Sequence, residues 1–236
     1  MDKKIFKKVA IHQPNFFPWL GYFDKIKKSD IFVFLDSVDY PKNGGKNMTS
    51  ICNRVAVSKS GASSWIRIPV QKAPLGTKIN KIKINNTVDW EMKIKEHCFN
   101  NYKTYAGYKA ASEILDEILD HRCFDLFEFN KRAIIVLCRK LDIEANFVSQ
   151  SSLRTKEKGT KLLVEICQKI KADTYLCGNG AKGYQDDELF KTNQLALQYQ
   201  NFKPKNYIKK DSFLPGLSIL DYMMRIYPWS CKDWSM

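Results

Sequence analysis

Residues 8–36 have the sequence KVAIHQPNFFPWLGYFDKIKKSDIFVFLD. The run Lys8–His12 carries three apolar residues and stops at a polar one, a pattern typical of a short buried strand. Two prolines within five positions make residues 13–18 a loop, because proline interrupts regular pairing. Residues 19–28 have apolar side chains at helical spacing and lysines in the last turn, which predicts a helix. The wholly apolar run 31–35 predicts a central parallel strand, so the segment is a β–loop–helix–β unit with a right-handed crossover.

The same alternation of strand and helix returns in the second half of the chain. Short apolar strands are predicted at residues 145–149, 174–177 and 195–199, with helices at 160–170 and 186–192 between them. Strands that alternate with helices in this way form a parallel sheet. We therefore expect an α/β fold with a Rossmann-like, mostly parallel sheet.

The middle of the chain has a different pattern. Three runs in residues 37–84 alternate apolar and polar side chains, as half-exposed strands do: 49–57, 64–70 and 79–84. Together they predict a small, basic, antiparallel β insertion. Residues 89–141 carry apolar stripes at helical spacing and predict a helical segment, whereas the chain after residue 201 is expected to be irregular. The length suits one large core, so we expect residues 1–236 to form a single domain.

The net charge of +14 is concentrated at the start of the chain. Residues 1–84 contain 16 Lys and Arg against 5 Asp and Glu, a net charge of +11. Such a field favours an anionic partner: a nucleotide phosphate, a nucleotide sugar, tRNA or an acidic lipid headgroup. The alternative is a solvated lysine surface, because 32 of the 39 basic residues are lysine and arginine is the preferred reader of phosphates and bases.

Cysteine spacing and hydropathy indicate the compartment. The seven cysteines are widely spaced and form no CxxC pair, which argues against a disulfide framework and for a reducing environment. The absence of closely spaced ligand pairs gives no motif for a metal. No apolar run approaches the roughly 18 residues of a membrane span, and the charged start is unlike a signal peptide. We expect a cytoplasmic protein; its oligomeric state is left open.

Polar or flexible residues follow four of the predicted parallel strands. These strand ends carry His12 with Gln13, Asp36, Ser151 with Ser152, and Gly178-Asn179-Gly180. Parallel βα units bind ligands at the carboxyl ends of their strands. The sequence therefore predicts one site at this edge, to which Asn15 in the loop after His12 also contributes.

His12 and Asp36 are the candidate catalytic residues. His12 would act as a general acid or base or as a phosphate donor, and the alternative is a strand-end histidine bonded to a backbone carbonyl. A carboxylate that ends a buried strand needs a partner, and Lys25, Lys42, Lys46 or Arg54 would supply a charge. The alternative for Asp36 is a role in capping a turn.

Two glycine-containing segments suit an anion. Lys158-Gly159-Thr160 opens a predicted helix, and backbone N–H groups at a helix start bind anions, although the spacing is not that of a Walker loop. Residues 178–183 match G-x-G-x-x-G, but they lie late in the chain before a short helix, so we expect no dinucleotide cofactor. Gly178 and Lys182 remain candidate anion contacts.

Nearly the whole chain resembles the WbqC-like family. The resemblance rests on the following segments and residues: Ile11–Ile26, Phe32–Asp36, Asn53-Arg54, Trp90, His97, Lys158–Thr160, Tyr175–Gly178, Tyr184 and Phe213–Asp221. It implies a cytoplasmic bacterial protein encoded among O-antigen and other surface-polysaccharide genes. The segment Ile226–Trp234 departs from the family's usual ending.

The surface-polysaccharide pathway that the resemblance implies and the basic surface together predict a transferase. It would modify a nucleotide-activated amino sugar by N-acyl or aminoacyl transfer. In this hypothesis His12 is the base and Asp36 orients it or holds the substrate. The remaining candidate substrate-binding residues are Gln13, Asn15, Lys25, Asn53, Arg54, Ser152, Lys158, Gly159, Thr160, Gly178, Lys182 and Tyr184.

Three alternatives stay open. The loop after His12 has some likeness to nucleotidyltransferases with a His-bearing first βα loop, although the second histidine is missing. A non-catalytic binder of sugar nucleotides would bind a ligand without making product. A tRNA-binding role would show a steep loss of affinity with added salt.

Overall fold

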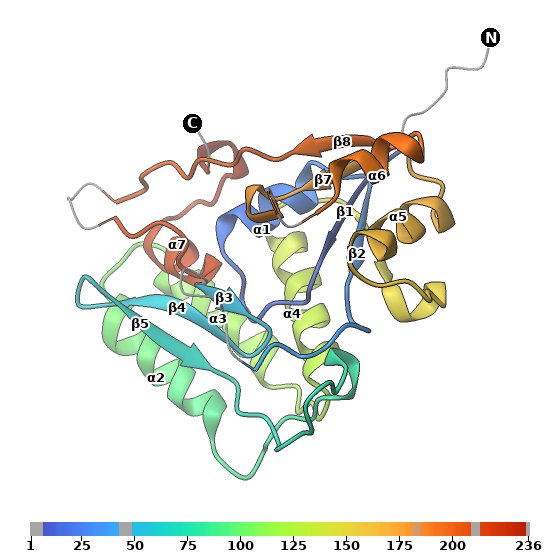
Figure 1. The fold of residues 1–236 in the computed structure, drawn as a ribbon. Coiled ribbons are helices and arrows are strands. Elements are labelled where there is room, and N and C mark those ends of the chain that lie inside the picture. The colour runs from blue at the N-terminus through green and yellow to red at the C-terminus, as the bar shows by residue number, and fades with distance from the viewer. Residues whose placement is uncertain (1–6, 43–48, 182, 184, 209–212, 235–236) are drawn as a thin grey trace.

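A five-stranded parallel sheet forms the centre of the molecule (Figure 1), with the strand order β6-β2-β1-β7-β8. The computed structural model describes residues 7–42, 49–181, 183, 185–208 and 213–234. The strands have these bounds: β1 Lys8–His12, β2 Ile31–Phe34, β6 Asn146–Ser149, β7 Thr174–Cys177 and β8 Ala196–Tyr199. All four neighbouring pairs are parallel. The predicted α/β fold is therefore confirmed.

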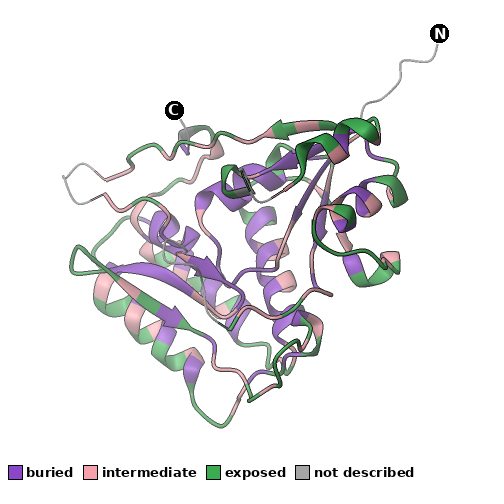
Figure 2. Cartoon of the chain, in the orientation of Figure 1, coloured by how far each residue is buried: buried purple, intermediate pink, exposed green. Residues whose placement is uncertain are grey.

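Helices cover both faces of this sheet. Helices α1 (Leu20–Lys27) and α4 (Leu126–Lys140) pack against one face, and α5 (Gly159–Lys169) and α6 (Asp187–Thr192) pack against the other (Figure 1). Alternate residues of a strand point to opposite faces. In β1, Ala10 accordingly joins the core beneath α1 and α4, whereas its neighbours join the core beneath α5 and α6. Burial on both faces explains why β1 and β2 are purple almost throughout in Figure 2.

The insertion forms a separate three-stranded antiparallel sheet of β3 (Ser50–Ile51), β4 (Arg54–Lys59) and β5 (Ala62–Arg67). The strand expected at residues 49–57 is in fact a hairpin of β3 and β4, since the chain turns at Cys52 and Asn53. The strand expected at 64–70 ends at Arg67, two residues before a proline that has no N–H to donate.

The third strand expected in the insertion, at residues 79–84, is wrong. Residues Ile79–Lys81 form a single 3₁₀ turn, and only isolated bridges follow it, from Lys83 to Asp125 and from Ile84 to Val70. The buried side chains Ile79 and Ile82 are three residues apart. That spacing is the period of a 3₁₀ helix, and it breaks the alternation that suggested a strand.

The helical segment consists of α2 (Trp90–Tyr102), α3 (Tyr108–Leu119) and α4. A further helix, α7 (Ile219–Arg225), lies in the part of the chain that was expected to be irregular. Six of its seven residues are buried, so it has no polar face and its sequence shows no amphipathic period. Ser218 caps it by accepting a hydrogen bond from the N–H of Leu220.

Asp221 ties α7 to α2 and to the preceding segment. Its carboxylate is fully buried and accepts hydrogen bonds from Tyr102 Oη at 2.7 Å and Tyr207 Oη at 2.7 Å. The guanidinium of Arg225, one helical turn further on, lies 3.1 Å away and supplies the opposite charge. The buried carboxylate is thus fully partnered, and its partners come from three parts of the sequence.

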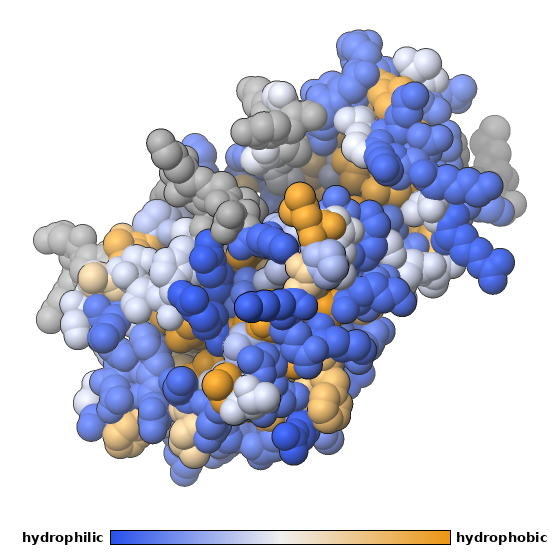
Figure 3. Space-filling view, turned by 60° about the horizontal axis from the view of Figure 1, so that its bottom comes forward, coloured by the Kyte–Doolittle hydropathy of each residue, from blue (hydrophilic) through white to orange (hydrophobic). Residues whose placement is uncertain are grey.

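The surface seen when the bottom of Figure 1 is turned forward is largely hydrophilic, with small separate apolar areas (Figure 3). Among the described residues, no helix combines the length and hydrophobicity needed to cross a membrane. The exposed large apolar side chains, such as Leu75 and Phe124, are scattered along the chain. Isolated exposed apolar residues of this kind are ordinary on globular proteins.

Replacing Asp221 with alanine should lower the free energy of unfolding by about 3–5 kcal/mol, because it leaves a cation and two tyrosine hydroxyls without their buried acceptor. Urea denaturation measures the loss. The matched control is Asp120→Ala, which removes an exposed carboxylate paired with Lys95 and should cost less than about 1 kcal/mol. Equal losses in the two variants would contradict the assigned role of Asp221.

Candidate functional site

The carboxyl ends of the parallel strands lie at one edge of the sheet, which we call the carboxyl edge. His12 is in register with Phe34, and Phe34 is in register with Ser149. On the other side of β1, Ala10 is in register with Leu176, which places Gly178 beside the end of β1. The ends of β6, β2, β1 and β7 are therefore neighbours, as the sequence predicted.

The His12 ring is held by a backbone carbonyl. Its Nδ1 lies 3.0 Å from the carbonyl oxygen of Gln13, so this nitrogen carries the proton and donates. The ring packs edge-on against Tyr22, with centroids 4.8 Å apart, and the Tyr22 hydroxyl donates to the same carbonyl at 2.9 Å. Burial and the nearby charge of Lys25 lower the pKa of His12 to about 3. The imidazole is consequently neutral at pH 7, and Nε2 keeps its lone pair.

Lys25 places an ammonium group at the same end of the sheet. The residue lies on α1 and is only 5% exposed. No described residue accepts a hydrogen bond from its Nζ or pairs with it. Burial lowers the pKa of Lys25 to about 8. A cation that is buried without a partner is costly, and groups with strongly shifted pKa values concentrate at functional sites.

The partner of Asp36 was wrongly expected to be a basic residue. The carboxylate is fully buried, and its Oδ1 accepts a hydrogen bond from the N–H of Ser151 at 2.9 Å. Its Oδ2 accepts from the side chain of Asn80 at 3.0 Å. Neutral N–H groups therefore partner the carboxylate, where we expected Lys25, Lys42 or Arg54; Lys46 lies outside the described residues. Among those residues, Asp36 makes no hydrogen bond to His12 and so does not orient it.

A pocket of about 650 Å³ lies where β2 and β6 end. We call it the carboxyl-edge pocket, and its lining residues are Ser37, Val38, Asp39, Lys78, Gln150, Ser151, Arg154, Thr155, Lys156, Glu157, Lys158, Gly159 and Leu162. Its volume is in the range of small-molecule sites, about 300–1,000 Å³. Of the predicted substrate-binding residues, Lys158 and Gly159 line it.

Four basic side chains border this pocket: Lys78, Arg154, Lys156 and Lys158. Lys78 is paired with Asp39 at 2.7 Å. The loop before α5 is held by Glu165, whose carboxylate accepts hydrogen bonds from the N–H groups of Lys156 and Glu157. These bonds and the charges of Lys169 and Lys156 lower the pKa of Glu165, with the bond from Glu157 contributing most. The N-terminus of α5 has no side-chain cap at Lys158, so its N–H groups are open to an anion.

The sequence did not identify several lining residues. Arg154 lines the pocket directly after a 3₁₀ turn and has a positive φ of 49°. Gln150, at the start of that turn, accepts a hydrogen bond from the N–H of Ser37 at 3.2 Å. The only sequence signal for them was the polar run after the strand at 145–149. Lys78 comes from the insertion, so its place at this edge depends on a contact that no local pattern encodes.

Other predicted residues lie away from the pocket. Thr160 accepts a hydrogen bond from the N–H of Asp186, and Ser152 donates to the carbonyl of Ser149, so both serve local structure. Asn15 is buried and donates to the carbonyl of Ser50 at 3.1 Å, which joins the loop after β1 to β3. Gln13 contributes the carbonyl that holds His12.

Asn53 and Arg54 lie in the β3–β4 hairpin. Arg54 stacks over the exposed ring of Trp65 at 4.9 Å. Neither residue lines the carboxyl-edge pocket. Lys182 and Tyr184 fall outside the described residues.

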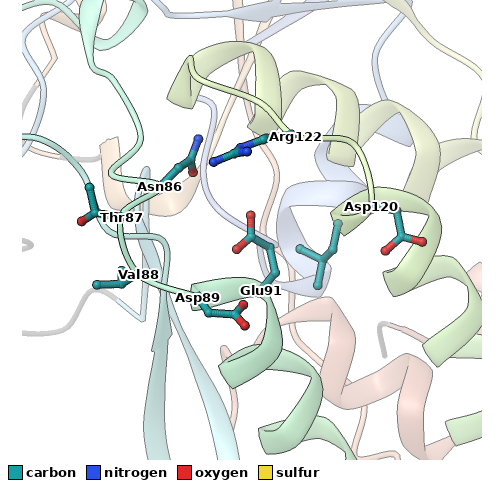
Figure 4. A pocket seen from close by; sticks show the side chains of 8 residues that line it. Asn86, Thr87, Val88, Asp89, Glu91, Asp120 and Arg122 are labelled. Carbon is teal, nitrogen blue, oxygen red and sulfur yellow. The ribbon is translucent and has the colours of Figure 1, made fainter.

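A second cavity of about 510 Å³ lies between the start of α2 and the turn from α3 to α4 (Figure 4). Arg122 extends toward Asn86, and Glu91 rises toward the same space (Figure 4). Asn86 already bonds the carbonyl of Cys123 and the indole of Trp90, and Asp89 caps α2. These polar groups stabilise the start of the helix, and no predicted site residue lines the cavity.

A model of the WbqC-like protein family matches residues 13–232. This chain belongs to that family. The matched range covers the carboxyl-edge pocket and Lys25, and it begins directly after His12. The chain is also 29% identical over 224 residues to a Mycobacterium tuberculosis protein named "Uncharacterized protein Rv1507c". The aligned region covers 93% of this chain and 94% of the relative. No solved structure matches the chain.

The buried imidazole gives this WbqC-like protein a pH-dependent stability. Because the pKa of His12 is about 3 in the folded state and 6.5 ordinarily, the unfolded state binds the proton first as the pH falls. When the pH is lowered from 7 to 5, the free energy of unfolding of the wild-type protein should therefore fall by about 2 kcal/mol more than that of the His12→Gln variant. Urea denaturation at the two pH values measures this difference. Identical losses in both proteins would show that the imidazole titrates normally.

Burial of the Lys25 charge predicts a pH dependence of the same sign at higher pH, with wild-type stability rising as the pH rises. Because its pKa is about 8 in the folded state and 10.5 ordinarily, Lys25→Met should raise the stability at pH 7 by roughly 3 kcal/mol. That gain should shrink as the pH rises from 8 to 10.5, since the folded wild type then sheds the buried charge. Denaturant unfolding across this range measures it, with Lys27→Met on the exposed side of α1 as control. A destabilised Lys25→Met variant at pH 7 would contradict the account.

Proposed function

We propose that this WbqC-like protein is a transferase that acts on a nucleotide-activated amino sugar, by N-acyl or aminoacyl transfer. The carboxyl-edge pocket carries the proposal, because it combines basic side chains with the uncapped start of α5. Membership of a family whose genes lie among those for surface polysaccharides supports a sugar nucleotide as the substrate. The net charge of +14 supports an anionic substrate.

In this proposal the diphosphate of the sugar nucleotide binds at the start of α5. The N–H groups of the first helical turn donate to phosphate oxygens, and Lys158 and Arg154 add charge-assisted hydrogen bonds. Arginine suits this role because its planar guanidinium can bond two phosphate oxygens at once. Asp36 fixes the opposite wall by holding the N–H of Ser151.

The reacting amine would lie toward His12, which packs on the α1 side and does not line the pocket, so the sugar would have to cross the carboxyl edge from the α5 side. Transfer forms a bond between the amine nitrogen and the acyl carbon of an activated ester, and the alcohol or thiol of that ester leaves with a proton. The pKa of about 3 makes His12 a weak base. We therefore assign its Nε2 the role of accepting a hydrogen bond that orients the amine, and not net uptake of the proton.

A non-catalytic binder of sugar nucleotides is the second candidate. Two observations favour it: the His12 imidazole is a weak base, and both oxygens of Asp36 are already bonded to neutral donors. Such a protein would bind the ligand in the same pocket and release it unchanged. Product formation in the presence of an acyl donor distinguishes the two functions.

Lys158→Ala and Arg154→Ala should each weaken binding of the sugar nucleotide about tenfold or more, because each removes a charged hydrogen bond of about 1.5–3 kcal/mol. Isothermal titration calorimetry measures the affinity after native mass spectrometry of a sugar-nucleotide panel has chosen the sugar. Lys161→Ala is the matched control, since this exposed lysine of α5 does not line the pocket. Unchanged affinity in both pocket variants, or failure of every sugar nucleotide to bind, would overturn the proposal.

A further inference from the structure

We propose that Lys25 forms a second phosphate-binding site, on the α1 side of the carboxyl edge at the end of β7. This inference rests on the proposed function only because it takes the ligand to be a phosphate-bearing small molecule. The site is separate from the carboxyl-edge pocket, which Lys25 does not line. It lies beneath α1, whereas α5 covers the opposite face of the sheet.

The Lys25 ammonium has no hydrogen-bond or ion-pair partner among the described residues. Lys25 is 95% buried, since only 5% of it is exposed, and no described residue accepts a hydrogen bond from its Nζ. The adjacent carboxylate, Asp24, is already used: it pairs with Lys28 at 2.9 Å and accepts from Gln200 at 2.6 Å. The Nζ atom is not among the fully buried unpartnered nitrogens, so a mostly desolvated ammonium keeps some contact with solvent, from which an anion could reach and stabilise it.

The strands beside Lys25 supply no opposite charge either. On β1 the nearest titratable group is His12, whose lowered pKa leaves it neutral at pH 7. On β7 it is the thiol of Cys177, whose pKa is raised by burial, so it is neutral as well. Both groups interact electrostatically with Lys25 and are therefore close to it. The positive charge is thus uncompensated from the neighbouring strands.

Gly178 lies directly beside the Lys25 ammonium and places no side chain of its own against it. A Cβ built on Gly178 would lie 3.6 Å from Lys25 Nζ and 3.8 Å from Cε, and it would meet nothing else within 4 Å. Apart from its chain neighbours Cys177 and Asn179, the Gly178 position therefore meets no described side chain other than Lys25 within 4 Å. The φ of Gly178 is not in the left-handed region, so the backbone itself does not require glycine. Lysine binds phosphate as a point charge, and glycine at position 178 keeps a methyl group away from that charge.

The experiment uses the full-length protein with Arg154 and Lys158 both replaced by alanine, so that the carboxyl-edge pocket no longer contributes. Calorimetry with inorganic pyrophosphate at pH 7 should then still detect binding. Lys25→Met in the same double variant should weaken pyrophosphate binding at least tenfold. Adding Gly178→Ala keeps the charge but sets a methyl group against it, and should weaken binding about threefold or more. Lys27→Met is the control and should leave the affinity unchanged.

A second readout reports on Lys25 directly. Acetylation by acetic anhydride, followed residue by residue with mass spectrometry, should show pyrophosphate protecting Lys25 and not Lys27. Thermal unfolding of each variant checks that it is folded. Binding that does not change with Lys25→Met or Gly178→Ala, or absence of protection at Lys25, would overturn the inference.

The two proposals fail in different ways. If Lys158→Ala weakens the binding of the sugar nucleotide while pyrophosphate binding is indifferent to Lys25, the second site is refuted and the proposed function stands. If pyrophosphate binds through Lys25 while no sugar nucleotide binds, the second site stands and the proposed function is refuted.

Discussion

The buried carboxylate of Asp36 is the constraint on which the candidate site depends. It follows the end of β2, and it joins two segments that are far apart in the sequence: Ser151 after β6, and Asn80 in the insertion. The N–H of Asn80 also donates to the carbonyl of Asp36 at 2.9 Å. A buried carboxylate must have its oxygens satisfied, so these segments are held at one place. The wall of the carboxyl-edge pocket is thereby fixed before any ligand binds.

The two faces of the parallel sheet give the carboxyl edge two different electrostatic environments. On the α5 side, basic side chains are exposed around a helix N-terminus, and their charges are solvated. On the α1 side, His12 and Lys25 are desolvated, and the pKa of each falls for that reason. An anion bound on the first side gains hydrogen bonds, whereas one bound on the second would also relieve a buried charge.

Local sequence patterns predicted the parallel strands and their helices because each of these elements has a clear hydrophobic signal. The run Lys8–His12 matches β1, and the position of His12 at its end follows from that run alone. The patterns failed where long-range contacts decide the structure. Helix α7 is buried nearly all round, and the turn at Ile79–Lys81 is set by packing and not by strand pairing.

The same limit applies to the site. The sequence suggested Lys158 and Gly159 as anion contacts because a glycine at a helix start is a local signal, and both residues line the carboxyl-edge pocket. It could not show that Asp36 would be satisfied by Asn80 and Ser151, since neither contact is local. Nor could it show that Lys25 would be buried without an acceptor, because that depends on how α1 packs against the end of β7.

Hydrogen–deuterium exchange with and without a sugar nucleotide identified by native mass spectrometry tests most directly whether the carboxyl edge binds the ligand. If the carboxyl edge binds the ligand, exchange should slow in residues 37–39 and 150–159, the segments that contribute most of the pocket lining. Protection confined to residues 86–91 and 119–122, around the cavity at the start of α2, would contradict binding at the carboxyl edge.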